Sequence, residues 1–182
     1  MGTAASLLLT VGLAVIFTDL THLTGLSSEE ALFLQTSASG LSLDGLLLAG
    51  MVVGALGVLD DVTISQASTV LALRGANPAQ RFGELFRRAM SVGRDHVSAT
   101  VNTLVLAYLG ASLPLLLIFS SSTLGFSDAV NLELIAKEVV ATLVGSIGLI
   151  AAVPVTTALA ALLARSIPAE RLAGEAHGGH VH

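Results

Sequence analysis

The sequence contains no cysteine, which excludes disulfide bonds, thiolate metal sites and cysteine nucleophiles. Charge is also scarce: 12% of the 182 residues are charged, against about 25% in an ordinary soluble domain. The net charge of −5 argues against nucleic acid as a partner. No phosphate-binding loop, His-Glu-x-x-His or Gly-x-Ser-x-Gly pattern occurs. We therefore expect no enzyme activity, no cofactor and no bound metal.

What the chain has in quantity is apolar sequence, since 53% of its residues are hydrophobic. Four spans are predicted at about 5–26, 43–73, 95–119 and 139–164. The second is longer than the ~20 residues that a span needs, so it must tilt, project beyond the bilayer or break near Asp60 and Asp61. Pro114 and Pro154 should kink the third and fourth spans. The sequence predicts an all-α, polytopic membrane helix bundle (1–166) with a disordered tail (167–182).

The cationic side chains predict how these spans are oriented. Five of the eight lie between the second and third spans, at 74–94, and two follow the fourth. The connection between the first and second spans has none. The positive-inside rule then places 74–94 and both termini in the cytoplasm, with the chain a multi-pass protein of the cell membrane.

The basic connection has a helical pattern of its own. Asn77 suits an N-cap, Pro78 suits the first helical position, and apolar residues then recur on one face. We expect a cytoplasmic amphipathic helix over about 78–92. It lies either at the inner membrane surface or against the cytoplasmic ends of the spans.

Polar residues recur at one depth inside three spans. Gln66, Asn102 and Thr157 each lie eight residues from an arginine that borders the span, or roughly 12 Å along a helix. Asp60 and Asp61 lie deeper, where a charged Asp costs about 2.5–3.5 kcal/mol on insertion scales. The candidate coupling or ion-binding residues are Asp60, Asp61, Ser65, Gln66, Asn102 and Ser146, with Arg94, Asp95, Thr142 and Thr157 as secondary candidates.

The aspartate pair has two interpretations. No Lys or Arg lies within the spans, so the carboxylates must be protonated, bind a cation, face water or meet a partner chain. Such a pair is what proton- or cation-coupled transporters need. Alternatively, the pair marks a helix break at the membrane edge, where Asp61 caps a separate helix over 62–73. Asp19 and His22, three residues apart near the outer end of the first span, either pair, line an exit or simply lie at the interface.

The motifs resemble a known family. The segments GVLDDVTISQ (57–66), GRDHVSATVNTLVLAYLGASLPLL (93–116) and EVVATLVGSIGLIAAVPVTT (138–157) are similar to the YibE/F family of bacterial inner-membrane proteins. Many members are longer, and the chain resembles their C-terminal part, as a fragment or one of a split pair would. The order of its polar motifs is also similar to the membrane half of SecD/SecF proteins, in which mid-membrane polar residues handle protons. That likeness implies that Asp60, Asp61 and Asn102 lie in a coupling region.

Together these observations predict a transporter-like membrane subunit, coupled to protons or cations through the aspartate pair. The alternative is a non-transporting scaffold or assembly partner, whose polar residues serve helix packing. In either case the expected partners are the lipid bilayer and a second membrane subunit, either a copy of the chain or a different protein.

Overall fold

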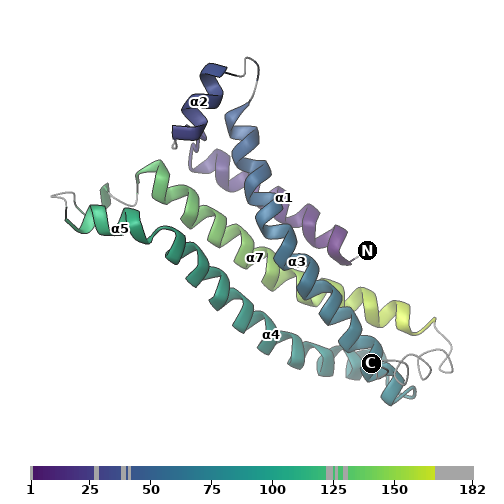
Figure 1. Ribbon diagram of the computed structural model, residues 1–182. Helices are drawn as coiled ribbons and strands as arrows, with labels where there is room; N and C mark the ends of the chain where they lie inside the picture. The colour runs from purple at the N-terminus through teal and green to yellow at the C-terminus, as the bar shows by residue number, and fades with distance from the viewer. Residues whose placement is uncertain are drawn as a thin grey trace, which may run out of the picture.

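The computed structural model describes residues 2–26, 29–37, 40, 42–121, 125, 127–128 and 131–166. Every regular element within these residues is helical, which confirms the predicted all-α class. The helices are α1 (Gly2–Leu20), α2 (Glu29–Ser37), α3 (Leu43–Ala76), α4 (Phe82–Ala111), α5 (Leu113–Ser120) and α7 (Glu133–Ala164) (Figure 1). The tail predicted at 167–182 lies outside the described residues.

Three helices, α1, α3 and α7, are each long and apolar enough to cross a membrane. The pair α4 and α5 passes the same test jointly, with a bend of 55° between them. The bend lies at Ser112, and Pro114 follows it in the first turn of α5. Because proline has no backbone N–H, α4 cannot continue its hydrogen-bond ladder through this point. The kink predicted in the third span is thus confirmed. Pro154 lies inside α7, which is one continuous helix, and the kink predicted there stays a prediction.

Helix α3 runs through Asp60 and Asp61 without a break, which excludes the helix break considered above. Its start is capped, since the Gly45 N–H donates to Ser42 Oγ at 3.1 Å. At 1.5 Å per residue its 34 residues span about 51 Å, well beyond the ~30 Å hydrocarbon core of a bilayer. The helix must therefore tilt strongly or project beyond the core.

The turn between α3 and α4 corrects the helix start predicted at Asn77 and Pro78. Asn77 is the C-cap of α3, and its N–H donates to the Leu73 carbonyl at 3.2 Å. Helix α4 begins instead after Arg81, whose N–H donates to Glu84 Oε2 at 3.4 Å. Asn fits either end of a helix, because it also tolerates C-terminal capping positions.

Residues 82–92 form the first turns of α4 and not a separate surface helix. Their apolar face is buried: Leu85 and Ala89 pack with Val70 of α3 and with Ala161 and Ala164 of α7. Of the two arrangements considered for this segment, the structure has the one packed against the ends of the spans. We call this end of the bundle, marked by Arg74, Arg81, Arg87 and Arg88, the basic end.

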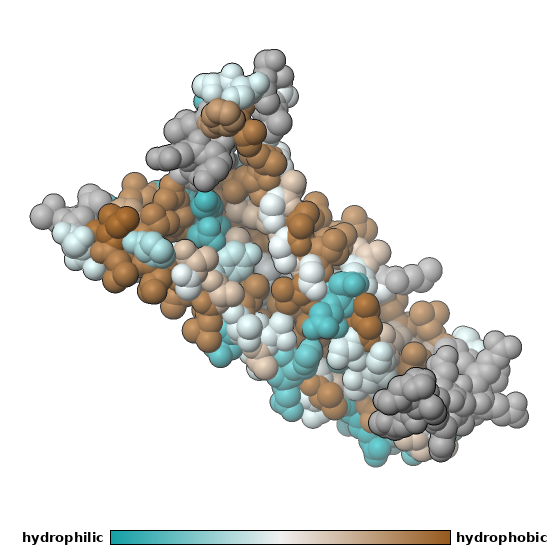
Figure 2. Space-filling model, in the orientation of Figure 1, coloured by the Kyte–Doolittle hydropathy of each residue, from teal (hydrophilic) through white to brown (hydrophobic). Residues whose placement is uncertain are grey.

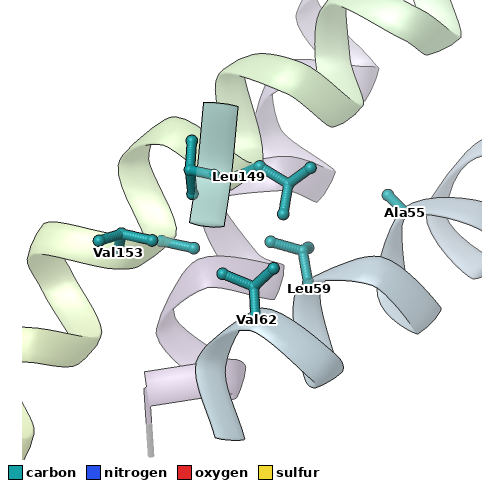
Figure 3. Close-up of a cluster of buried hydrophobic side chains, with 7 residues drawn as sticks. Ala55, Leu59, Val62, Leu149 and Val153 are labelled. Carbon is teal, nitrogen blue, oxygen red and sulfur yellow. The ribbon is translucent and has the colours of Figure 1, made fainter. Parts of the chain in front are cut away.

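Helix α7 is the centre of the bundle and packs against α1, α3 and α4 (Figure 1). Figure 3 shows the middle of this core, where Leu59 and Val62 of α3 point toward Leu149 and Val153 of α7. Leu59 and Val62 are completely buried. The contact sets the rotation of α3 about its own axis.

At the end opposite the basic end, Glu133 fixes the connection that follows α1. Its Oε1 accepts from the N–H groups of Thr24 (2.9 Å) and Gly25 (2.6 Å), and its Oε2 accepts from Thr24 Oγ1 (2.8 Å). Gly25 has a φ of +76°, which favours glycine. One carboxylate thereby ties the start of α7 to the end of α1.

Candidate functional site

Asp60 and Asp61, the leading candidates from the sequence, are exposed on the outside of the bundle. Within the described residues, neither carboxylate takes part in an ion pair. The neighbouring Leu59 and Val62 occupy the buried face of α3, so helix geometry turns the two carboxylates away from α7. The aspartate pair therefore lies outside the interior of a single chain.

Gln66, one turn closer to the basic end, is 3% exposed and joins three helices. Its Nε2 donates to Thr157 Oγ1 of α7 at 2.7 Å and to the Ala89 carbonyl of α4 at 3.0 Å. Thr157 Oγ1 in turn donates to the Val153 carbonyl at 2.6 Å. Gly93 makes room for this amide, because a Cβ there would lie 2.6 Å from Gln66 Oε1. These polar groups act in helix packing.

Helix α1 adds polar groups that the sequence interpretation missed. Thr3 Oγ1 and Thr63 Oγ1 lie 2.8 Å apart, which joins α1 to α3. Gly2 abuts Thr156, since a Cβ on Gly2 would lie 2.7 Å from Thr156 Oγ1. The available signal was the spacing of Thr3, Ser6 and Thr10 at three to four residues, which puts them on one helix face.

The remaining candidates divide between the surface and the interior. Asn102, Ser65, Arg94 and Asp95 are exposed, and Arg94 Nε donates to the Met90 carbonyl at 3.4 Å and not to an aspartate. On α7, Ser146 Oγ is buried and has no hydrogen-bond partner in the part of the chain that the structure describes, and Thr142 Oγ1 donates to the Glu138 carbonyl at 2.7 Å. Asp60, Asp61 and Asn102 consequently share no interior pocket with Ser146.

The exposed candidates lie on the outer surfaces of α3 and α4, at neighbouring levels. Gln66 is beside Gly93, and Gly54 is beside Tyr108, so the two helices are antiparallel. In this register Ser98 of α4 lies at the level of Asp61. Figure 2 shows the result as a hydrophilic band that crosses from the middle of α3 onto α4. We call this surface the acidic face; its members are Asp60, Asp61, Ser65, Ser68, Arg94, Asp95, Ser98 and Asn102.

The surface of α7 at the same level is apolar. Leu149 of α7 packs with Leu59 and Val97, which puts it at the level of the aspartate pair. Its neighbours Ile147 and Ile150 are exposed, by 38% and 57%. The polarity of the acidic face is thus a property of one side of the bundle and not of its depth alone.

Asp19 and His22 lie at the other end of the bundle, where both are exposed. With Thr18, Thr24 and Asp44 they line a hollow of about 530 Å³. His22 has a φ of 52°, an uncommon conformation outside glycine. Among the described residues, no group of three His, Asp or Glu side chains could hold a metal ion, here or at the acidic face.

Neither the curated proteins nor the solved structures contain a match to the chain. The family model for YibE/F-like proteins matches residues 1–166, which include all the helices described above. The chain is therefore a multi-pass membrane protein and belongs to the YibE/F-like family.

Proposed function

We propose that the protein is a transporter-like membrane subunit, in which Asp60 and Asp61 bind a proton or a cation at a face that a second subunit completes. The observation that carries this proposal is the exposure of both carboxylates on the outside of the bundle. In this arrangement the coupling pathway runs between subunits and not through the middle of one chain.

The cost of exposing charge supports a covered face. A carboxylate facing hydrocarbon is expensive, and ionisable groups in membranes almost always face protein or water-filled cavities. Because Ile147 and Ile150 are exposed at the same level, we infer that lipid borders the bundle on the α7 side. The acidic face then needs protein or water in front of it.

Small residues beside the carboxylates support a second helix as the cover. Gly54 and Gly57 are exposed on the same side of α3 as Asp61, and a Cβ on Gly57 would meet nothing within 4 Å. Small residues of this kind let membrane helices approach closely. A second copy is the simplest partner, since a two-fold interface uses the same patch on both subunits. It would also bring Arg94 of one subunit near the carboxylates of the other.

The alternative is a scaffold without transport. It is favoured by two hydrogen bonds between helices of the same chain: Gln66 of α3 donates to Thr157 of α7, and Thr63 of α3 bonds to Thr3 of α1. In that case Asp60 and Asp61 serve only the subunit contact.

Single cysteines test the covered face, because the chain has none of its own. Ser65→Cys and Ser98→Cys should form disulfide-linked dimers in membranes, whereas Ile150→Cys on α7 is the control that should not. An impermeant maleimide should label Ser65→Cys if water reaches the face. Cross-linking only at Ile150→Cys, or at none of the three positions, would contradict a second copy that covers the acidic face.

The double variant Asp60→Asn/Asp61→Asn separates the two functions. Asn removes the titrating charge but keeps hydrogen-bonding capacity. A coupled transporter should lose its activity in a complementation assay while dimerisation and melting temperature are retained. A scaffold should stay active, so an active and stable double variant would contradict the coupling proposal.

A further inference from the structure

Two hollows meet at the end of the bundle opposite the basic end. The first, of about 220 Å³, lies between α3, α4 and α7 and is lined by Gly50, Met51, Tyr108, Lys137 and Glu138 among others. The second, of about 330 Å³, lies between the α4–α5 bend and α7. Tyr108 and Glu138 line both, so the hollows lie side by side.

The two hollows differ in chemistry. The first carries a cation and an anion side by side: Lys137 Nζ lies 4.0 Å from Glu138 Oε1, and both side chains are about a quarter exposed, at 26% and 28%. Lys137 is the single lysine of the sequence. The second hollow is a trough of apolar side chains, which include Val105, Leu109, Val139 and Leu143.

The fold produces this pair of hollows directly. The 55° bend at Ser112 turns α5 away from the α4 axis, and the trough lies where the two helices meet α7. On α3, Gly50 lines the first hollow, and because a Cβ there would meet nothing within 4 Å, the glycine leaves this space open. Leu109 and Val139, on the trough, are 50% and 43% exposed, so the trough opens to the surroundings of the bundle.

The charges and the trough together select a ligand class. Lys137 lies within two turns of the start of α7, where its long side chain can reach toward a membrane interface. Lysines at this depth attract lipid phosphates, but the adjacent Glu138 disfavours a headgroup that is purely anionic. A headgroup with both a phosphate and a primary ammonium complements the two side chains. The open apolar trough suits an acyl chain.

We propose that this double hollow binds one bilayer phospholipid with a phosphate–ammonium headgroup. The phosphate lies at Lys137, the ammonium lies at Glu138, and one acyl chain occupies the trough. The site is separate from the acidic face and does not depend on the function proposed for it.

Native mass spectrometry of the detergent-purified protein tests the lipid site, with synthetic phosphatidylethanolamine and phosphatidylglycerol as probes. The unmodified protein should retain phosphatidylethanolamine in preference to phosphatidylglycerol. Lys137→Gln should weaken the retention of both lipids by about tenfold, as expected for the loss of one charge-assisted contact. Lys137→Arg, which keeps the charge, should retain them.

Two further variants separate binding from folding. Glu138→Gln should abolish the preference for phosphatidylethanolamine without lowering the retention of phosphatidylglycerol. If Glu138 were merely structural, its loss would lower the retention of both lipids. Leu109→Trp should fill the trough and release the lipid. Ile16→Trp, at an exposed position of α1, is the matched control and should retain the lipid. Equal retention of both lipids by the unmodified protein, or unchanged retention by Lys137→Gln, would overturn the proposal.

Discussion

The side-chain amide of Gln66 on α3 donates a 2.7 Å hydrogen bond to the hydroxyl of Thr157 on α7. The same amide reaches the backbone of α4 at Ala89, so one buried side chain connects the three helices of the basic end. The shared level predicted from the sequence is thus confirmed for Gln66 and Thr157. It was wrong for Asn102, which lies nine residues beyond Gly93, the residue of α4 beside Gln66. The contacts of Gln66 are those of helix association.

Removing this hydrogen bond should destabilise the bundle. Gln66→Leu should cost about 1–3 kcal/mol, because it removes the amide and leaves the Thr157 hydroxyl without its donor. Thr157→Val should cost less. A double-mutant cycle, measured by unfolding in mixed micelles, should give a coupling free energy of about 0.6–1.7 kcal/mol. Strictly additive effects would show that the bond contributes nothing.

Gly93→Ala should destabilise the contact between α3, α4 and α7. The new Cβ would lie 2.6 Å from both Gln66 Oε1 and Val153 Cγ1, which is too close without a shift of the helices. Overpacking of this kind typically costs about 1–3 kcal/mol. Gly83→Ala is the matched control within the same helix, because Gly83 is exposed and its Cβ would meet nothing within 4 Å. Melting temperature in detergent measures both, and an equally stable Gly93→Ala protein would contradict the packing.

Glu133→Gln should loosen the connection between α1 and α7. Gln keeps one acceptor oxygen, so one of the two sets of bonds to Thr24 and Gly25 is lost together with the charge that strengthens them. We expect faster hydrogen exchange at the Thr24 and Gly25 amides and a small drop in melting temperature. Asp19→Asn, at the same end but exposed, should change neither. Unaltered exchange in Glu133→Gln would show that the clamp is dispensable.

The orientation of the chain is a prediction that cysteine labelling checks. A cysteine at Ser121 should react with an impermeant reagent from outside intact cells, and one at Asn77 should not. Asn77 is the better probe of the basic end, because the neighbouring Gln80 is only 7% exposed and would be shielded on either side of the membrane. Outside labelling at Asn77 would reverse the predicted topology.

The sequence was sufficient to predict the bundle, the approximate spans and the bend near Pro114, because apolar length and proline act locally. It also placed Gln66 and Thr157 at one level, since counting from the basic end measures depth. It could not predict which way the aspartates face. Polar and apolar residues are mixed around α3, so its rotation depends on how Leu59 and Val62 meet Leu149, a contact between residues far apart in the chain.

The central position of α7 has a consequence for biosynthesis. It follows α1, α3 and α4 in the chain, yet each of those helices packs against it. During synthesis from the N-terminus, the earlier helices enter the membrane before α7, the helix that buries Thr10, Leu59 and Ala89 in the finished bundle. Until α7 arrives, Gln66 has no Thr157 to bond, and the nascent chain exposes polar side chains to lipid. The bundle is therefore most open to an insertion factor, or to a neighbouring subunit, just before its last described helix is made.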